Sequence, residues 1–299
     1  MDVDGATPNL TETTVLLSVQ TRIIGTYKAV PTSLVEIAAD KKLIHVSSQL
    51  YDSKELRNIF KLDNARTEFL KSRCLPSLFR SGTYLLPIAC VAEVEDYLEA
   101  YLIKRKAAVA KFVEVYDKVR EDSIKRLGVA ACPDKYPPTS QVENYFTVDI
   151  RYLTFETPEK LREVSPGLYK KQMEKAQRDV AEVAEEAKVV LRSTLADLTA
   201  QLAEKLGPAA DGKRKALRTN AFDRLNDFLK VFDSRNVCSD ASLKTMVDQL
   251  RSVMKGTDVT IVKSDVELKA KMAENLATVA CQLKDMVVEQ KTRRLERGV

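Results

Sequence analysis

The chain has 299 residues, 44% of them hydrophobic and 30% charged, which is enough to bury a core and excludes an intrinsically disordered polypeptide. Its 9 glycines, 10 prolines and lack of tryptophan exclude a collagen-like repeat and favour helix over strand. The net charge of +5 comes from 48 basic and 43 acidic residues that are mostly interleaved, as on a solvated helical surface. A single histidine leaves little of the usual acid–base inventory of enzymes and excludes multi-histidine metal sites.

Several β-branched or alternating runs predict strands in a chain that is otherwise rich in helical patterns. Thr13–Ile24 and Lys42–Ser47 are two such runs, and they are candidates to pair with each other. Tyr84–Pro87 is expected to form an apolar turn, and Tyr145–Phe155 alternates enough to be a third strand or an extended clamp on the core. Val259–Val262 is a further short β-branched run.

Apolar residues spaced three and four apart predict six helices, two of them very long. These helices are expected from an Asp52–Ser53 N-cap to near Pro76, from about Ile88 to Leu127, from Pro166 to Leu206, from about Ala216 to Phe232, from Ser239 to Met254, and from Ser264 onward. The two long helices, 88–127 and 166–206, both need an apolar partner, and the segment between them is long enough to reverse the chain. We therefore expect them to lie antiparallel to each other.

The pattern as a whole predicts a mainly α fold of long antiparallel helices, a coiled-coil-like bundle, with a small α/β N-terminal region. Three consecutive parts are expected: residues 1–87 as the small α/β region, 88–165 as a long helix plus an extended connector, and 166–299 as a C-terminal helical bundle. Long apolar stripes are typical of an intramolecular core, but they leave open a homo-oligomer that packs through them.

Cysteine usage and the N-terminus predict a cytoplasmic protein. The five cysteines are widely separated and never form a C-x-x-C pair, so neither a disulfide framework nor a zinc ribbon is indicated. Residues 1–10 lack the basic and apolar regions of a secretory signal. The longest apolar run, Tyr84–Ala92, has nine residues and contains Pro87, which is well short of the roughly 20 residues that span a bilayer.

A phosphate-binding loop is suggested by spacing alone at Gly207–Arg214, which matches G-x-x-x-x-G-K. Arg214 stands where a serine or threonine hydroxyl must bind Mg²⁺, and Pro208 removes one N–H group from the cradle. The preceding segment is moreover predicted as a long helix instead of the required strand. We interpret the motif as a helix stop followed by an exposed basic turn, with no cofactor.

Other candidates for catalysis or metal binding are also weak. Ser252–Lys255 matches S-x-x-K but has no S-D-N or K-T-G partner. The carboxylates Glu93, Glu95, Asp96 and Glu99 are expected on a solvated helix flank. His45 is expected as a packed or edge residue of a strand, because metal sites need several donors. The sequence therefore predicts no catalytic residue, no metal site and no enzyme.

Basic clusters are the remaining candidates for contact with a partner or with nucleic acid. Two clusters are candidate sites. The first contains Lys213, Arg214, Lys215 and Arg218, and the second contains Lys291, Arg293, Arg294 and Arg297. No aromatic platform is interleaved with either of them, so nucleic acid is not specifically indicated. The second cluster lies at a helix C-terminus, where the helix dipole favours cations in any case.

Four stretches of the chain together resemble a known family. They are the strand that ends in Gly25–Lys28, the following KKLIHVSSQLYDSKELRNIF segment, the small-glycine-aromatic-proline turn Ser81–Pro87, and the late segment NAFDRLNDFLKVFDSRNV. This order resembles the phage and mobile-element family catalogued as domain of unknown function 3150. The resemblance implies a non-enzymatic helical protein, encoded near MoxR-like AAA+ ATPases and von Willebrand A-type partners, with an adaptor or remodelling-substrate role. It supplies no functional residues.

These observations favour a non-enzymatic helical assembly or adaptor protein, phage or mobile-element encoded, that acts in the cytoplasm, which is the host cytoplasm if a phage encodes it. A MoxR-like AAA+ ATPase is the partner that the resemblance implies. One alternative is a nucleic-acid-binding protein that uses the basic loop and the C-terminal helix. Another is a helical pore former that exposes Tyr84–Ala92 after a rearrangement.

We predict that the protein does not hydrolyse nucleotides, because the Gly207–Arg214 segment lacks the metal-binding hydroxyl. Phosphate release from ATP and GTP should stay at background for both the wild-type protein and a Lys213→Ala variant. Release above background that disappears in Lys213→Ala would contradict this prediction.

Overall fold

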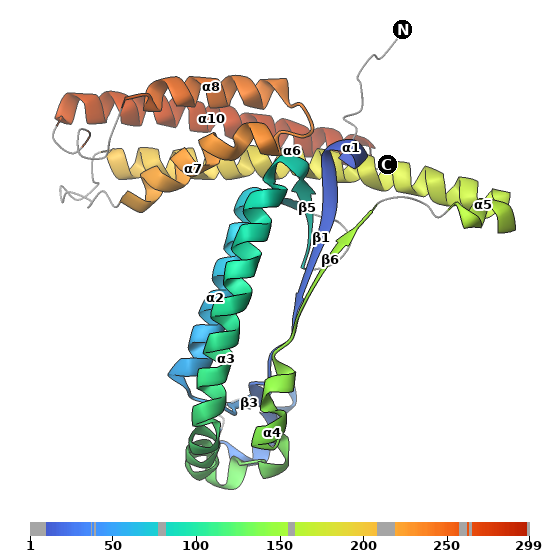
Figure 1. Ribbon diagram of the computed structural model, residues 1–299. Helices are drawn as coiled ribbons and strands as arrows, with labels where there is room; N and C mark the ends of the chain where they lie inside the picture. Colours follow the sequence, from blue (N-terminus) through green and yellow to red (C-terminus); the bar gives the residue numbers. More distant parts are fainter. Residues whose placement is uncertain are drawn as a thin grey trace. The chain divides into compact units, whose positions relative to one another are not determined.

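The structure is a computed structural model that describes residues 10–36, 38, 40–76, 82–154, 159–207, 219–256, 262 and 265–297. Within these residues the protein is mainly α with small β-sheets, as the sequence predicts (Figure 1). None of the helices that the structure describes is long and apolar enough to cross a membrane.

The chain divides into two compact units that alternate along the sequence. Unit 1 comprises Met1–Leu16, Ser72–Cys90 and Leu153–Val299, and unit 2 comprises Leu17–Lys71 and Val91–Tyr152. This division differs from the three consecutive parts 1–87, 88–165 and 166–299 that the sequence predicts. The reason is that the chain leaves unit 1 within its first strand, returns to it for residues 72–90, and returns again after Tyr152, and local patterns do not report such long-range returns.

The strands that the structure describes form two sheets, and their pairing corrects two predictions. The larger sheet has the order β4-β5-β1-β6 and contains β1 (Thr14–Thr21), β4 (Leu75–Pro76), β5 (Thr83–Pro87) and β6 (Val148–Leu153). The smaller sheet contains β2 (Tyr27–Val30) and β3 (Val46–Gln49). The predicted pairing of the two N-terminal runs is wrong, because β3 pairs with β2, a strand that was not predicted. The predicted apolar turn at Tyr84–Pro87 is instead strand β5, which pairs antiparallel with β4.

Other predicted segments have different outcomes. The third predicted strand is found as β6. The β-branched run Val259–Val262 lies outside the described residues except for Val262, which is buried.

Unit 2 is built on two antiparallel helices, α2 (Lys54–Arg73) and α3 (Val91–Leu127), together with the short α4 (Thr139–Val142) (Figure 1). Ser53 caps α2 as predicted, since its Oγ accepts hydrogen bonds from the backbone N–H groups of Glu55 and Leu56 at 3.1 and 3.3 Å. Helix α3 ends before Gly128, whose φ of +52° places it in the left-handed region that favours glycine.

The core of unit 2 is rich in aromatic rings that meet edge to face. Tyr51 contacts the rings of Phe112 and Tyr136 with centroid distances of 6.0 and 5.3 Å, both close to perpendicular. The buried members of this core are Ile24, Leu50, Tyr51, Leu56, Ile59, Val109, Phe112, Tyr116, Tyr136, Val142 and Phe146. They come from both helices, from both ends of the β2–β3 segment and from the connector after α3, so one core holds all of these segments.

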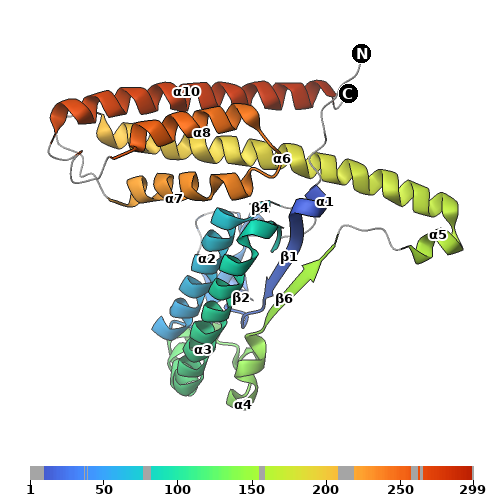
Figure 2. The same ribbon diagram turned by 45° about the horizontal axis from the view of Figure 1, so that its top comes forward.

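Unit 1 contains an up-and-down helical bundle. Its helices are α6 (Pro166–Leu206), α7 (Thr219–Arg235), α8 (Ala241–Met254) and α10 (Val266–Arg297). Each of the four packs against the next, and α10 closes the ring by packing along α6. Figures 1 and 2 show that neighbouring helices of this ring run in opposite directions. The short helices α1 (Leu10–Thr13) and α5 (Lys160–Val164) also belong to this unit.

Both long predicted helices are confirmed, but each has its partner within its own unit. Helix α3 contacts α2 in unit 2, and α6 packs along α10 in unit 1. The predicted antiparallel pairing of 88–127 with 166–206 is therefore not the arrangement found. An apolar stripe predicts which face of a helix is buried, but it does not specify the partner helix. Several helices of this chain carry an apolar stripe that could cover that face.

We predict that Leu98→Asp unfolds unit 2, because Leu98 is 2% exposed on α3 and an unpaired carboxylate there costs several kcal/mol. The matched control is Ile103→Asp on the same helix, where the side chain is 72% exposed. Thermal melting followed by circular dichroism should show a large loss for Leu98→Asp and almost none for Ile103→Asp. Equal melting of the two variants would show that the stripe of α3 is not packed.

Candidate functional site

The predicted basic site residues lie wholly or in their side chains outside the part of the chain that the structure describes. Lys213, Arg214, Lys215 and Arg218 lie outside the described residues. Lys291, Arg293, Arg294 and Arg297 lie on the last turns of α10, where the backbone is helical but the side chains are outside the description. Their role in binding a partner or nucleic acid stays a prediction.

The other singled-out residues are spread over unit 2. Glu93, Asp96 and Glu99 are exposed on the first turns of α3, and Glu95 beside them accepts a hydrogen bond from the hydroxyl of Tyr152. His45 is exposed immediately before β3. These side chains form no common site.

Buried polar groups between α2 and α3 form a cluster that we call the α2–α3 clamp, made of Asp63, Arg66, Tyr101 and Arg105. All four are 7% exposed or less. Asp63 Oδ1 accepts hydrogen bonds from the Tyr101 hydroxyl at 2.6 Å and from Arg105 Nε at 2.9 Å. Arg66 lies over the ring of Tyr101 with its guanidinium carbon 5.4 Å from the centroid. Burial, followed by the hydrogen bond to Asp63, raises the pKa of Tyr101 well above its ordinary value, so it stays a neutral donor.

Arg105 extends the clamp to two further segments of unit 2. Its two Nη atoms donate to the carbonyl oxygens of Phe146 at 3.1 Å and Arg22 at 3.2 Å. Arg22, directly after β1, and Phe146, two residues before β6, are thereby tied to the same guanidinium. Because both members of the Asp63–Arg105 ion pair are engaged in this way, the clamp is a structural device that sets the register of the helices.

The clamp was missed in the sequence although a signal for it exists. Asp63 and Arg66 follow Leu56 and Ile59 at helical spacing on the buried stripe of α2. Arg105 likewise continues the stripe of α3 that contains Leu98 and Tyr101, with Val109 and Phe112 after it. A charged residue at a position that periodicity assigns to the core is the signal.

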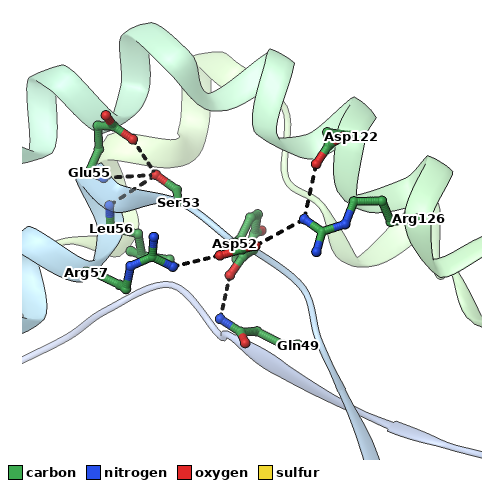
Figure 3. Close-up of polar contacts among 9 residues, drawn as sticks. Gln49, Asp52, Ser53, Glu55, Leu56, Arg57, Asp122 and Arg126 are labelled. Carbon is green, nitrogen blue, oxygen red and sulfur yellow. Dashed lines mark hydrogen bonds and ion pairs between the residues drawn. The ribbon is translucent and has the colours of Figure 1, made fainter.

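The root of the β2–β3 hairpin is held by a network at the start of α2 (Figure 3). Asp52 accepts hydrogen bonds from Arg57 at 2.6 Å and from Arg126 at 3.1 Å, and Arg126 also pairs with Asp122. The hydrogen bonds from Arg57 and Arg126 lower the pKa of Asp52. These ion pairs are therefore intact at neutral pH, and they are lost as the pH falls through that lowered pKa. Asp52, three residues after β3, is thus linked to both helices.

The hairpin itself presents open backbone edges. Leu50 N–H donates to Thr26 C=O at 2.8 Å, so Thr26 and Leu50 form a hydrogen-bonded pair of the antiparallel ladder. Hydrogen-bonded and non-hydrogen-bonded pairs alternate, so the next pair, Tyr27 opposite Gln49, is not hydrogen-bonded. The N–H and C=O groups of Tyr27 and Ala29 on β2 therefore point away from β3, and those of Ser47 and Gln49 point away from β2. Among the residues that the structure describes, this sheet has no third strand. We call the outward backbone groups of these residues the hairpin edge.

Exposed apolar side chains accompany the hairpin edge. Tyr27 on β2 is 67% exposed, and Leu43 in the connection between the strands is 83% exposed. Leu34 and Val35 in the same connection are also exposed. An open strand edge beside apolar side chains can take up an extended segment of another chain. Only the short β-prone run Tyr27–Val30 could have signalled this site in the sequence.

Comparison with known proteins adds no family to this geometry: no family model matches the chain, and no curated protein or solved structure is significantly similar to it. The resemblance to the domain of unknown function 3150 family therefore stays a prediction.

We predict that Arg105→Met destabilises unit 2 by about 3–5 kcal/mol, because it leaves the Asp63 carboxylate buried without its cation. The control is Arg57→Met, which breaks a pair between exposed partners and should change the free energy of unfolding little. Urea titrations of both variants measure the difference. Similar midpoints for Arg105→Met and the wild type would contradict the structural role of the clamp.

Proposed function

We propose that the protein is a helical adaptor of the cytoplasm that acts by binding other proteins, and that the β2–β3 hairpin is the surface that receives them. The hairpin edge carries this proposal, because it combines unpaired strand backbone with exposed Tyr27 and Leu43. Phage or mobile-element origin and an ATPase partner are supported by the family resemblance.

An added strand is the mode of binding that these groups favour. A two-stranded sheet is marginal by itself, and a third strand would satisfy the backbone groups of its edge. Strand β2 is better suited than β3, because its sequence YKAV contains residues that favour strands whereas VSSQ is polar. Pro31, directly after β2, limits the edge to the few residues before it.

The anchored root makes the hairpin a suitable platform. Ile24 before β2 and Leu50 after β3 are buried in the core of unit 2, and Asp52 is tied to both helices. A binding segment on a rigid support loses less conformational entropy when the partner docks.

The test uses a purified MoxR-like AAA+ ATPase from the same genome as the partner and isothermal titration calorimetry as the measurement. Ala29→Pro removes an outward N–H group and is compatible with an edge strand, and we expect it to weaken binding at least about tenfold, which corresponds to one or two lost hydrogen bonds. Ala29→Ser keeps the N–H group and should bind like the wild type.

Two results would contradict the proposal. Binding that is equal for wild type and Ala29→Pro would remove the hairpin edge from the interface, and no binding of the ATPase would remove that partner. Salt-dependent retention on DNA would favour the nucleic-acid alternative, and leakage of liposomes would favour the pore-forming alternative.

A further inference from the structure

Helix α6 is much longer than two of the helices that surround it in unit 1. It has 41 residues, against 17 in α7 and 14 in α8. At 1.5 Å per residue these lengths are about 62, 26 and 21 Å, so α7 and α8 cover only part of α6. Figures 1 and 2 show the N-terminal half of α6 running on beyond both of them. The buried residues of α6 begin at Val183.

The half of α6 that runs beyond α7 and α8 carries a charged stripe with an unusual order. Lys171, Lys175 and Arg178 are exposed basic residues, and they are followed on the same face by exposed Glu182 and half-buried Glu186. The steps between them are four, three, four and four residues, which keeps all five on one side of the helix. At about 100° per residue, this side is displaced by about 120° around the helix from the side on which Val183 and Ala187 are buried. We call these five residues the α6 stripe.

The order of charges in the α6 stripe is complementary to itself when reversed. In an antiparallel pair of α6 helices related by a two-fold axis between Arg178 and Asp179, Lys171 faces Glu186 and Lys175 faces Glu182 of the other copy. The same alignment places Arg178 opposite Asp179 of the second copy. A parallel pair would instead place like charges side by side, which is unfavourable.

Apolar side chains flank the charges in the same alignment. Leu168, which is 44% exposed, lies opposite half-buried Val189 of the other copy. The aligned segment from Leu168 to Val189 has 22 residues in each copy, or about 33 Å of helix. In this alignment an apolar Leu168–Val189 pair therefore lies at each end of the contact, and the ion pairs lie between the two apolar pairs.

We propose that the α6 stripe is a self-association surface, on which a second copy of this chain docks antiparallel through its own α6. The charge order favours a second copy as the partner. In the antiparallel alignment each charged residue of the stripe faces a residue of opposite charge on the identical helix. Exposed ion pairs are individually weak and screened by salt. The resulting dimer is accordingly reversible, dependent on concentration and weakened by salt. This inference is independent of the proposed function, since the α6 stripe and the hairpin edge are in different units.

The experiment uses charge reversal in the full chain, with mass measured by sedimentation equilibrium. Lys171→Glu with Lys175→Glu leaves Arg178 as the one basic residue of the stripe, and Glu182→Lys with Glu186→Lys makes all five residues of the stripe basic. We expect each double variant to weaken self-association at least about tenfold. An equimolar mixture of the two should restore the dimer, because every reversed charge then faces an opposite one.

Controls separate the surface from general effects on charge and folding. The quadruple variant that carries all four reversals should dimerise like the wild type, and Lys230→Glu, on the exposed side of α7, should leave the dimer unchanged. Circular dichroism confirms that each variant is folded. Raising the salt from about 0.1 M to about 1 M shortens the Debye length from about 10 Å to about 3 Å and should shift the wild type toward monomer.

Three outcomes overturn the proposal: a wild-type protein that stays monomeric at low salt and high concentration, double variants that dimerise as well as the wild type, or a mixture of the double variants that stays monomeric. Because the hairpin residues are unchanged in these variants, loss of the dimer with intact ATPase binding leaves the proposed function standing. Loss of ATPase binding in Ala29→Pro with an intact dimer leaves this inference standing.

Discussion

The buried ion pair between Asp63 and Arg105 is the constraint on which unit 2 depends. Two charges removed from water stabilise a fold only when their remaining hydrogen bonds are also made. Here Tyr101 supplies one donor to the carboxylate, and the carbonyl groups of Arg22 and Phe146 accept from the guanidinium. One side chain therefore aligns α2 with α3 and also holds the segments that follow β1 and precede β6. Any other register of the helices would leave a buried charge without its partner.

The position of the hairpin follows from this arrangement. Its first strand begins shortly after Arg22, and its second strand leads through Asp52 and the Ser53 cap into α2. Both roots are fixed by buried or charge-assisted contacts, whereas the strands between them keep their outer edges open. Interaction sites are commonly found where a rigid scaffold presents a segment that its own fold does not cover. The hairpin edge has this character.

Unit 1 also presents a segment that its own fold leaves exposed, but its core is held mainly by apolar helix stripes. Its bundle is held by apolar stripes and by a two-bonded ion pair from Arg192 to Asp240, the residue that also caps α8 by accepting from Leu243 N–H. The helices of the bundle differ greatly in length, so α7 and α8 flank only the C-terminal part of α6, and its N-terminal half runs on beyond them. The α6 stripe lies there, and its reversed charge order distinguishes it from an ordinary solvated helix face.

The sequence by itself determined the helical class, the bounds of α3 and α6 to within a few residues, and the Ser53 cap, because helix periodicity and capping act over a few neighbouring residues. It did not determine that β3 pairs with β2, that α3 and α6 take partners in separate units, or that Asp63 meets Arg105 across 42 residues. These contacts join segments far apart in the chain, and many alternative pairings satisfy the same apolar and charge patterns locally. Only the tertiary structure selects among them, because the cost of an unpaired buried charge or an uncovered stripe is decided by the whole core at once.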